Sequence, residues 1–268
     1  TYIGIFIIMF SVISSGMVAV MTQNIGAGRP GVAYQARQLG LAFNAVLGVI
    51  MSLFLSLGAG TILSGVGVAD ALMQPAKTYL QIVGGFCILN ALIPICSSYL
   101  RAFGFSKEPL YASIIGNVIN FCLNAFFLFV LHKGVAGVAT ATVISRIINL
   151  VIVVLLGAVL VKAKQHPERE SNRAVMGQII RIGLPSACET AIYNVSMTLV
   201  IRFLNQMDAQ GLNVTARSYT MQITNFSYCV GAALAQANAI MTGWHIGAKE
   251  YDACDRGTKK AAVIGVIV

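Results

Sequence analysis

The heptapeptides IGAGRPG at residues 25–31 and IGAKEYD at residues 246–252 decide the fold of this chain. Each copy follows a long apolar run, at residues 2–22 and 219–243, and opens a short loop that carries positive charge. A unit that recurs 221 residues later indicates an internally repeated architecture. Because both copies follow runs of bilayer length, the repeat consists of membrane helices, a pattern typical of secondary transporters.

The composition agrees with a membrane protein. The chain is 57% hydrophobic and 10% charged, with a mean hydropathy of +0.79, whereas a soluble domain of this length needs more polar surface. About 20 apolar residues cross the hydrocarbon core. We predict spans at residues 2–22, 39–63, 78–100, 109–131, 136–161, 184–206 and 217–243, with an eighth beginning near residue 260.

The Lys and Arg residues that give the chain its net charge of +9 lie mostly in the loops between these spans and do not form one basic surface. Of 18 Lys and Arg residues, 13 lie in odd-numbered loops: Arg29, Arg37, Arg101, Lys107, Lys162, Lys164, Arg169, Arg173, Arg181, Lys249, Arg256, Lys259 and Lys260. The even-numbered loops hold Lys77, Lys133, Arg202 and Arg217. The positive-inside rule therefore predicts that the odd loops are cytoplasmic, so the basic charge reflects orientation and not a surface for nucleic acid. We expect a multi-pass protein of the plasma membrane, with the lipid bilayer as its partner and no nucleic acid.

The loops that contain the two IGA motifs are both odd-numbered and are separated by six spans, so the repeat is parallel and its unit is six helices. We predict an all-α polytopic membrane protein of twelve helices when complete, with about 7.5 present here. Residues 1–161 would hold helices two to six of the first lobe, and residues 162–183 a cytoplasmic connector. Residues 184–268 would hold helices one, two and part of three of the second lobe. The missing helices would precede Thr1 and follow Val268.

A stripe of amides marks the span at residues 109–131. Asn117, Asn120 and Asn124 share one helical face with Ser113. Asparagine in hydrocarbon is costly unless it is hydrogen-bonded. One asparagine would suit helix–helix hydrogen bonding, worth about 0.6 kcal/mol per contact. A stripe over three turns instead favours a water-lined cavity, so we predict that the three asparagines line it.

Glu189 is the only acidic residue well inside a predicted span, and it shares a helical face with Tyr193. A buried carboxylate must be paired, protonated or facing water, so an intramembrane acid is a functional candidate. We predict that Glu189 and Tyr193 bind a coupling Na⁺ or H⁺. The alternative is a structural ion pair between Glu189 and Arg217 or Arg202.

The neighbouring span, at residues 217–243, carries Gln222, Asn225 and Gln236 within about 60° of one another on one helical face. We predict that these three residues, together with Arg217, also line the cavity.

Another polar stripe lies on the span at residues 136–161. Thr142, Ser145 and Asn149 are spaced at i, i+3 and i+7, with Arg146 alongside. Arg146 either snorkels towards the interface or pairs within the bundle, and the sequence does not choose between the two.

Two prolines lie in predicted spans. Pro94 should kink its helix or free a carbonyl. Pro185 should lie in the first turn of its helix, where proline is tolerated.

No catalytic motif is present. GxSxG, HExxH and paired intramembrane acids are absent, the histidines lie in separate loops, and the cysteines have no CxxC spacing. We therefore expect no enzyme, no metal site and no cofactor. A seven-helix receptor does not account for the repeat.

Six segments, in order along the chain, resemble the multidrug and toxic compound extrusion (MATE) family. They are Gln23 with GAG at 26–28 and Ala33, LRAFGFSKEPLYASIIGNVINFCLN at 100–124, GVAGVATATVISR at 134–146, GLPSACE at 183–189, ARSYTMQI at 216–223 and QANAIMTGWHIGA at 236–248. The resemblance implies two six-helix lobes around a V-shaped cavity that alternates between the membrane faces. It also implies export of cationic or amphipathic drugs or metabolites in exchange for Na⁺ or H⁺, and we expect a monomer.

The chain departs from the family pattern at three positions. Asn124 stands where many members have an aspartate, so Glu189 resembles the acid that other members carry in the second lobe. In the second loop, Lys249 replaces a glycine, and Trp244 occupies the position equivalent to Gln23. The alternative function is a lipid-linked oligosaccharide flippase of the same superfamily. Such a flippase would line its cavity with several basic residues, whereas here only Arg146 lies deep in a span.

Overall fold

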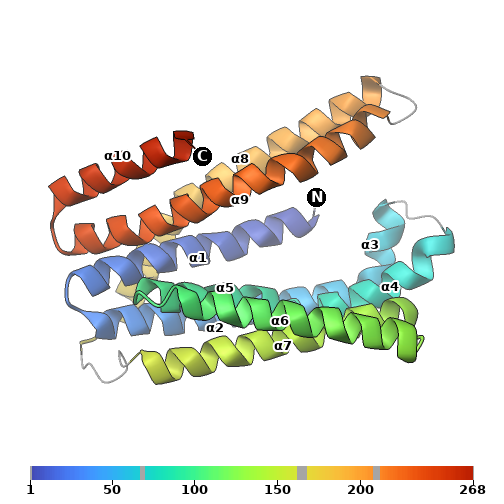
Figure 1. The fold of residues 1–268 in the computed structure, drawn as a ribbon, viewed down its shortest axis with the longest axis horizontal. Helices are drawn as coiled ribbons and strands as arrows, with labels where there is room; N and C mark the ends of the chain where they lie inside the picture. The colour runs from blue at the N-terminus through green and yellow to red at the C-terminus, as the bar shows by residue number, and fades with distance from the viewer. Residues whose placement is uncertain (1, 67–69, 162–167, 208–211, 268) are drawn as a thin grey trace. The chain divides into compact units, whose positions relative to one another are not determined.

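The computed structural model describes residues 2–66, 70–161, 168–207 and 212–267, which fold almost entirely into helices (Figure 1). The elements are α1 Tyr2–Gly26, α2 Pro30–Leu57, α3 Ala59–Val66, α4 Asp70–Gly85, α5 Ile88–Ala102, α6 Lys107–Ala125, the π-helical η1 Phe126–Val130, α7 Gly134–Leu160, α8 Asn172–Met207, α9 Leu212–Gly247 and α10 Tyr251–Ile267. These described ranges contain no β-strand, and the predicted all-α class is confirmed.

Three helical segments of the described chain are long and apolar enough to cross a bilayer: α2, residues 107–130 of α6 and η1, and α7. The helices α4 and α5 together make a fourth, bent by 42° at the break between them. The predicted spans at residues 2–22, 184–206 and 217–243 lie within α1, α8 and α9, respectively. The chain is thus a multi-pass membrane protein.

The bend in the α4–α5 span lies at residues 86–87 and not at Pro94, where the sequence predicts either a kink or a freed carbonyl. The new helix needs partners for its first N–H groups. Ser52 of α2 supplies one, because its Oγ accepts a hydrogen bond from the N–H of Ile88 (3.2 Å). The preceding Gly84 and Gly85 favour the break, and α5 then continues through Pro94.

The helix α8 begins at Asn172, twelve residues before the predicted start of its span. The amphipathic run at residues 174–182 is helical and continuous with the span, and Val175 and Ile179, one turn apart, are both buried. Pro185 therefore lies inside the helix and not in its first turn, which corrects the prediction.

The chain separates into two compact units. The terminal unit consists of residues 1–33 and 173–268, and the central unit of residues 34–172. These units are defined by contacts, whereas the predicted lobes are defined by the repeat. The lobe boundaries stay a prediction.

In the terminal unit, α1 and α9 end with the same backbone geometry. Each end has the two hydrogen bonds of a Schellman motif. The bonds run from N–H to C=O: Gly28 to Ile25 (3.0 Å) and Arg29 to Asn24 (2.8 Å) after α1, and Lys249 to Ile246 (3.1 Å) and Glu250 to His245 (2.8 Å) after α9. Every position in one motif lies 221 residues from its counterpart in the other, so the sequence repeat is also a repeat of structure.

The two repeated helix ends also pack against each other, within the terminal unit. A Cβ added to Gly26 would overlap the carbonyl of Trp244, and a Cβ added to Gly247 would overlap the carbonyl of Gln23. Gly26 and Gly247 are equivalent positions, as are Gln23 and Trp244. The contact is therefore reciprocal, as in an interface around a two-fold axis, and it requires glycine on both sides.

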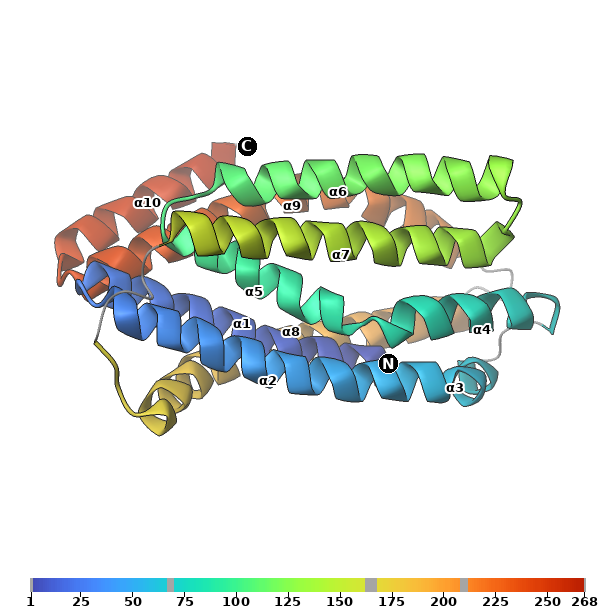
Figure 2. The same ribbon diagram turned by 90° about the horizontal axis from the view of Figure 1, so that it is seen from below.

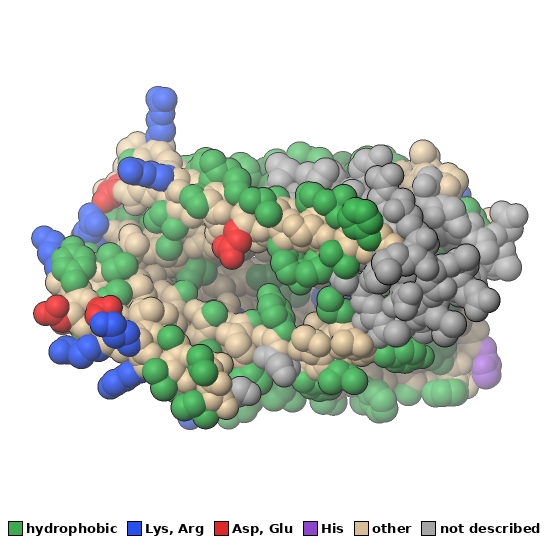
Figure 3. Space-filling view, turned by 90° about the horizontal axis from the view of Figure 1, so that it is seen from above, with side chains coloured by type: hydrophobic (Ala, Val, Ile, Leu, Met, Phe, Trp, Pro, Cys, Tyr) green, Lys and Arg blue, Asp and Glu red, His purple; other side chains and the backbone are tan. Residues whose placement is uncertain are grey.

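Lys and Arg side chains gather at the end of the molecule where α9 meets α10 (Figure 3). The exposed residues there are Lys249, Arg256, Lys259 and Lys260, and Lys259 pairs with Asp255 of the preceding turn (2.6 Å). The charge is concentrated beyond the apolar part of α9, as expected for a helix that leaves a membrane.

The core of the central unit is built around Tyr99 of α5, which is almost fully buried. Its ring lies edge-on to Tyr34 (6.4 Å between centroids) and to Phe103 (5.1 Å). The guanidinium of Arg37 lies 4.6 Å from the centre of the Tyr99 ring, a cation–π distance. These contacts hold α2 against α5.

Gln35 of α2 holds the end of the connector that follows α7. Its Nε2 donates to the Glu170 carbonyl (2.7 Å) and to Asn172 Oδ1, while its Oε1 accepts from the Glu170 N–H (3.0 Å). The side chain is buried, so these bonds satisfy an amide that would otherwise be costly.

We predict that Lys249→Gly stabilises the protein. Lys249 has φ of +62°, a left-handed conformation that its counterpart Gly28 adopts at +73° without a Cβ penalty. The gain should be about 1 kcal/mol after the extra chain entropy of glycine is counted, measured by thermal unfolding in detergent. Lys249→Ala removes the charge but keeps the Cβ. Equal stability of the Gly and Ala variants would contradict the strain assigned to this position.

Candidate functional site

The helices α6 and α7 lie side by side in the central unit (Figure 2). A chain of hydrogen bonds joins them. Asn124 Nδ2 donates to Asn120 Oδ1 (3.0 Å), Asn120 Nδ2 donates to Ser145 Oγ (3.3 Å), and Ser145 Oγ donates to the carbonyl of Thr142 (2.9 Å). Part of the amide stripe therefore serves helix–helix hydrogen bonding, one of the two interpretations of its sequence.

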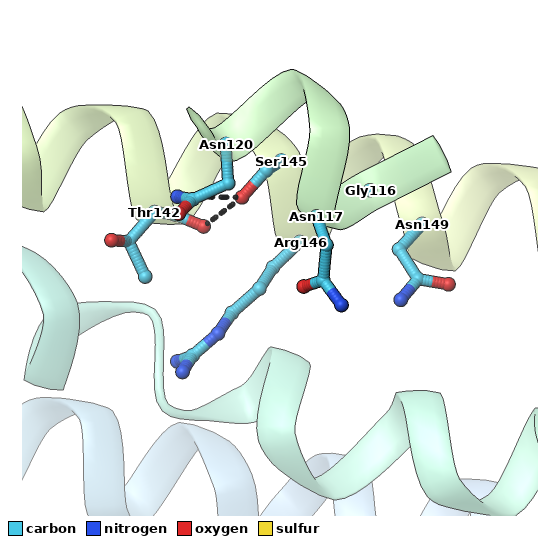
Figure 4. Close-up of a pocket in the computed structure, with 7 residues that line it drawn as sticks. All are labelled: Gly116, Asn117, Asn120, Thr142, Ser145, Arg146 and Asn149. Atoms are coloured by element: carbon cyan, nitrogen blue, oxygen red, sulfur yellow. Dashed lines mark hydrogen bonds between the residues drawn. The ribbon is translucent and has the colours of Figure 1, made fainter. Parts of the chain in front are cut away.

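Asn117 and Asn120 of the stripe face a pocket of about 140 Å³ between the two helices (Figure 4). Its lining residues are Gly116, Asn117, Asn120, Thr142, Ser145, Arg146 and Asn149. A cavity of roughly 10–15 Å³ is the minimum for one water. The pocket can therefore hold several waters or one polar group of a larger ligand.

Gly116 allows α6 and α7 to approach closely at one end of the pocket. A Cβ at this position would lie 3.3 Å from the Cβ of Asn149, which is tighter than ordinary packing. The close approach buries the Asn149 Oδ1 atom, which has no hydrogen-bond partner. A buried acceptor of this kind is costly unless a bound water or ligand donates to it.

Arg146 extends from α7 on the same side as Asn117 extends from α6 (Figure 4). Among the residues that the structure describes, no carboxylate lies within ion-pair distance of Arg146.

Snorkelling does not explain Arg146 either. It follows the first residue of α7 by 12 positions and precedes the last by 14, which puts it near the middle of the helix. At 1.5 Å per residue, each end is about 18–21 Å away. The interface of a ~30 Å hydrocarbon core would lie about 15 Å away, beyond the reach of the side chain. Arg146 therefore projects into the polar pocket.

The predicted residues of the central unit divide into two groups. Asn117 and Asn120 line the pocket, whereas Asn124 does not line it and hydrogen-bonds to Asn120. The spacing of the facing stripe predicts one polar face on α7, and the structure adds this face to the lining of the pocket. That spacing was the signal for its role. Gly116 carried no signal in the sequence beyond its position next to Asn117. Whether this pocket belongs to a transport cavity stays a prediction.

In the terminal unit, Glu189 and Tyr193 are exposed on α8. No hydrogen bond or ion pair reaches Glu189 from the described residues. The predicted ion-binding role of the two residues remains to be tested.

The other predicted residues of the terminal unit are on α9. Gln222, Asn225 and Gln236 are exposed along this helix. The side chains of Arg217 and Arg202, and with them the alternative ion pairs with Glu189, lie outside the described residues.

Comparison with known proteins links this geometry to a transporter family. Residues 1–126 match the family model described as MatE. Over 257 residues, the chain is 32% identical to YisQ of Bacillus subtilis, an uncharacterized transporter, covering 94% of this chain and 56% of the relative. It is also 25% identical over 226 residues to YoeA of Bacillus subtilis, a probable multidrug resistance protein, with 79% and 47% covered. The chain spans about half the length of these relatives.

Solved structures share the fold. One, described as the outward-facing conformation of a multidrug resistance MATE family transporter of the MOP superfamily, matches with a TM-score of 0.82. The match covers 98% of this chain and 58% of that chain, at 20% sequence identity. At this identity the likeness shows the fold alone.

We predict that Asn120→Ala destabilises the protein, because it removes both bonds that connect Asn124 to Ser145. At about 0.6 kcal/mol for each bond inside a membrane, the loss should be about 1 kcal/mol in thermal or denaturant unfolding. Asn117→Ala is the matched control. The Asn117 amide lies on the same face of α6 but makes no hydrogen bond to a described residue. Its removal should therefore change stability little. Equal losses in the two variants would contradict the hydrogen-bond chain.

Proposed function

Because the chain belongs to the MATE family, we propose that the protein is a secondary transporter that exports cationic or amphipathic drugs or metabolites. Export would be driven by exchange for Na⁺ or H⁺ and would proceed by alternating access. Other expectations remain part of this proposal: location in the plasma membrane with the odd loops in the cytoplasm, a monomeric state, and no catalytic role.

The observation that carries this proposal is the reciprocal contact between the ends of α1 and α9. Alternating access needs two similar halves that separate on one side of the membrane while they close on the other. The glycines at positions 26 and 247 allow a close contact between equivalent backbone segments. Such a contact suits the closed side of a gate, because it is made by backbone atoms of both repeats and contains no interlocking side chains.

The polar groups supply sites for an ion and a substrate. Glu189 and Tyr193 offer a carboxylate and a phenol on the exposed face of α8 for the coupling ion. The α6–α7 pocket offers neutral amides and hydroxyls within membrane-length helices. Polar groups of this kind mark substrate and ion pathways in membrane proteins.

The flippase alternative has weaker support. A site for a lipid-linked pyrophosphate should contain several cations, since each phosphate binds best to multiple Arg or Lys groups. Arg146 is the one basic residue that lines the α6–α7 pocket. Relatives named as multidrug resistance proteins also favour efflux.

We predict that Glu189→Gln reduces gradient-driven efflux roughly ten- to hundredfold, because a charge-assisted interaction of about 1.5–3 kcal/mol is lost. The measurement is dye efflux from vesicles that contain the full-length protein, under an imposed Na⁺ or H⁺ gradient. Asp252→Asn, an exposed acid in the first turn of α10, is the control and should retain efflux. Unchanged efflux in Glu189→Gln would remove Glu189 from the mechanism.

We also predict that Gly247→Ala slows transport roughly tenfold. This is the change expected if the state in which the two helix ends are in contact is destabilised by about 1.4 kcal/mol. The added methyl would overlap the carbonyl of Gln23. Gly231→Ala, on the same helix, meets no atom within 4 Å and serves as the control in the same efflux assay. Equal rates for the two variants would mean that the contact has no part in the transport cycle.

A further inference from the structure

The α6–α7 pocket has an unusual charge for a protein expected to export cations. Arg146 lines it, together with neutral amide and hydroxyl side chains, and the described lining contains no carboxylate. A fully cationic ligand would be repelled by the guanidinium. The electrostatics of the pocket therefore favour a ligand that brings negative charge.

A counter-charge is needed because Arg146 has none in the described part of the protein. An arginine at the centre of a spanning helix is costly unless a counter-charge or water compensates its charge. Snorkelling does not reach the interface from this position, and no described acid is within ion-pair distance. Water in the pocket relieves part of this cost, and an anionic group would relieve more of it, since guanidinium–carboxylate bonds are charge-assisted.

The groups around the guanidinium complement a carboxylate. The planar fork of Arg146 can donate two parallel hydrogen bonds to two carboxylate oxygens. Asn117 is exposed beside it in Figure 4 and makes no hydrogen bond to a described residue, so its amide is available as a further donor. Asn149 also lines the pocket, and in Figure 4 its amide nitrogen lies on the side of Asn117, where it can donate to the same ligand.

The volume sets the size of the group that fits. About 140 Å³ accommodates a carboxylate with one or two substituents, but not a whole drug-sized molecule. The rest of the molecule would extend out of the pocket along the apolar surfaces of the neighbouring helices.

We propose that the Arg146 pocket binds the carboxylate of an amphipathic or zwitterionic substrate, with Arg146 as its charge partner and Asn117 as a second donor. This inference rests on the proposed transport function and narrows its substrate class. Purely cationic molecules would then bind elsewhere in the protein.

The test uses three probes that share one apolar body and differ in charge: phenylbutyrate, phenylbutyramide and phenylbutylammonium. Equilibrium binding to the purified full-length protein is measured by titration calorimetry. We expect phenylbutyrate to bind more tightly than the amide and the ammonium compound. Arg146→Gln should weaken phenylbutyrate binding roughly ten- to hundredfold, and Arg146→Lys less, because lysine keeps the charge but loses the fork.

Two matched variants keep the test decisive. Arg181→Gln removes an exposed arginine of α8, outside the pocket, and should leave binding unchanged. Asn117→Ala should weaken phenylbutyrate binding severalfold without loss of stability, so the proposal can be judged even if Arg146→Gln fails to fold. Equal binding of the three probes, or phenylbutyrate binding unchanged in Asn117→Ala and in every folded Arg146 variant, would overturn the proposal. Saturation of the site by chloride alone would do the same.

The outcome is separable from that of the transport proposal. Gradient-driven efflux of a cationic dye, combined with no carboxylate binding, would refute the anion site and leave the transporter intact. Arg146-dependent binding of phenylbutyrate, with no gradient-driven transport of any probe, would support the site and refute the proposed function.

Discussion

The close approach of two backbone segments, at Gly26 and at Gly247, is the constraint on which the terminal unit depends. Each glycine lies where a Cβ would overlap a carbonyl of the other repeat. The two helix ends can meet this closely because both finish in the same hydrogen-bonded turn. That turn sets the direction in which the chain leaves each helix. The repeat thus appears as a sequence period, as a capping geometry and as an interface between equivalent residues.

The central unit is governed by the cost of polar groups in hydrocarbon. On the facing sides of α6 and α7, Asn120 and Ser145 are bonded to each other across the two helices, and Asn117, Thr142 and Asn149 line the pocket beside them. The hydrogen-bond chain fixes the two helices relative to each other, and this leaves Arg146 projecting into a polar space of defined size. A stripe of asparagines therefore has two roles, one in holding the helices and one in lining the site.

Much of this was readable from the sequence. The helical class, the multi-pass architecture and the repeat follow from hydropathy and from the IGA period, and the polar faces of α6 and α7 follow from helical spacing. The positions of the bend before α5 and of the start of α8 did not follow. They depend on tertiary contacts, such as the Ser52 hydroxyl that caps Ile88 and the buried face of Val175 and Ile179. Sequence spacing also could not decide whether Arg146 pairs or snorkels, since that depends on its depth and neighbours.

The central claim is that the reciprocal contact opens and closes during transport. The most direct test is the distance between spin labels at positions 27 and 248 of the full-length protein, in a cysteine-free background, measured by double electron–electron resonance. Alternating access predicts two distance populations, one short and one long, whose ratio shifts when substrate or the coupling ion is added. A single short distance under every condition, in protein that still transports, would contradict the account.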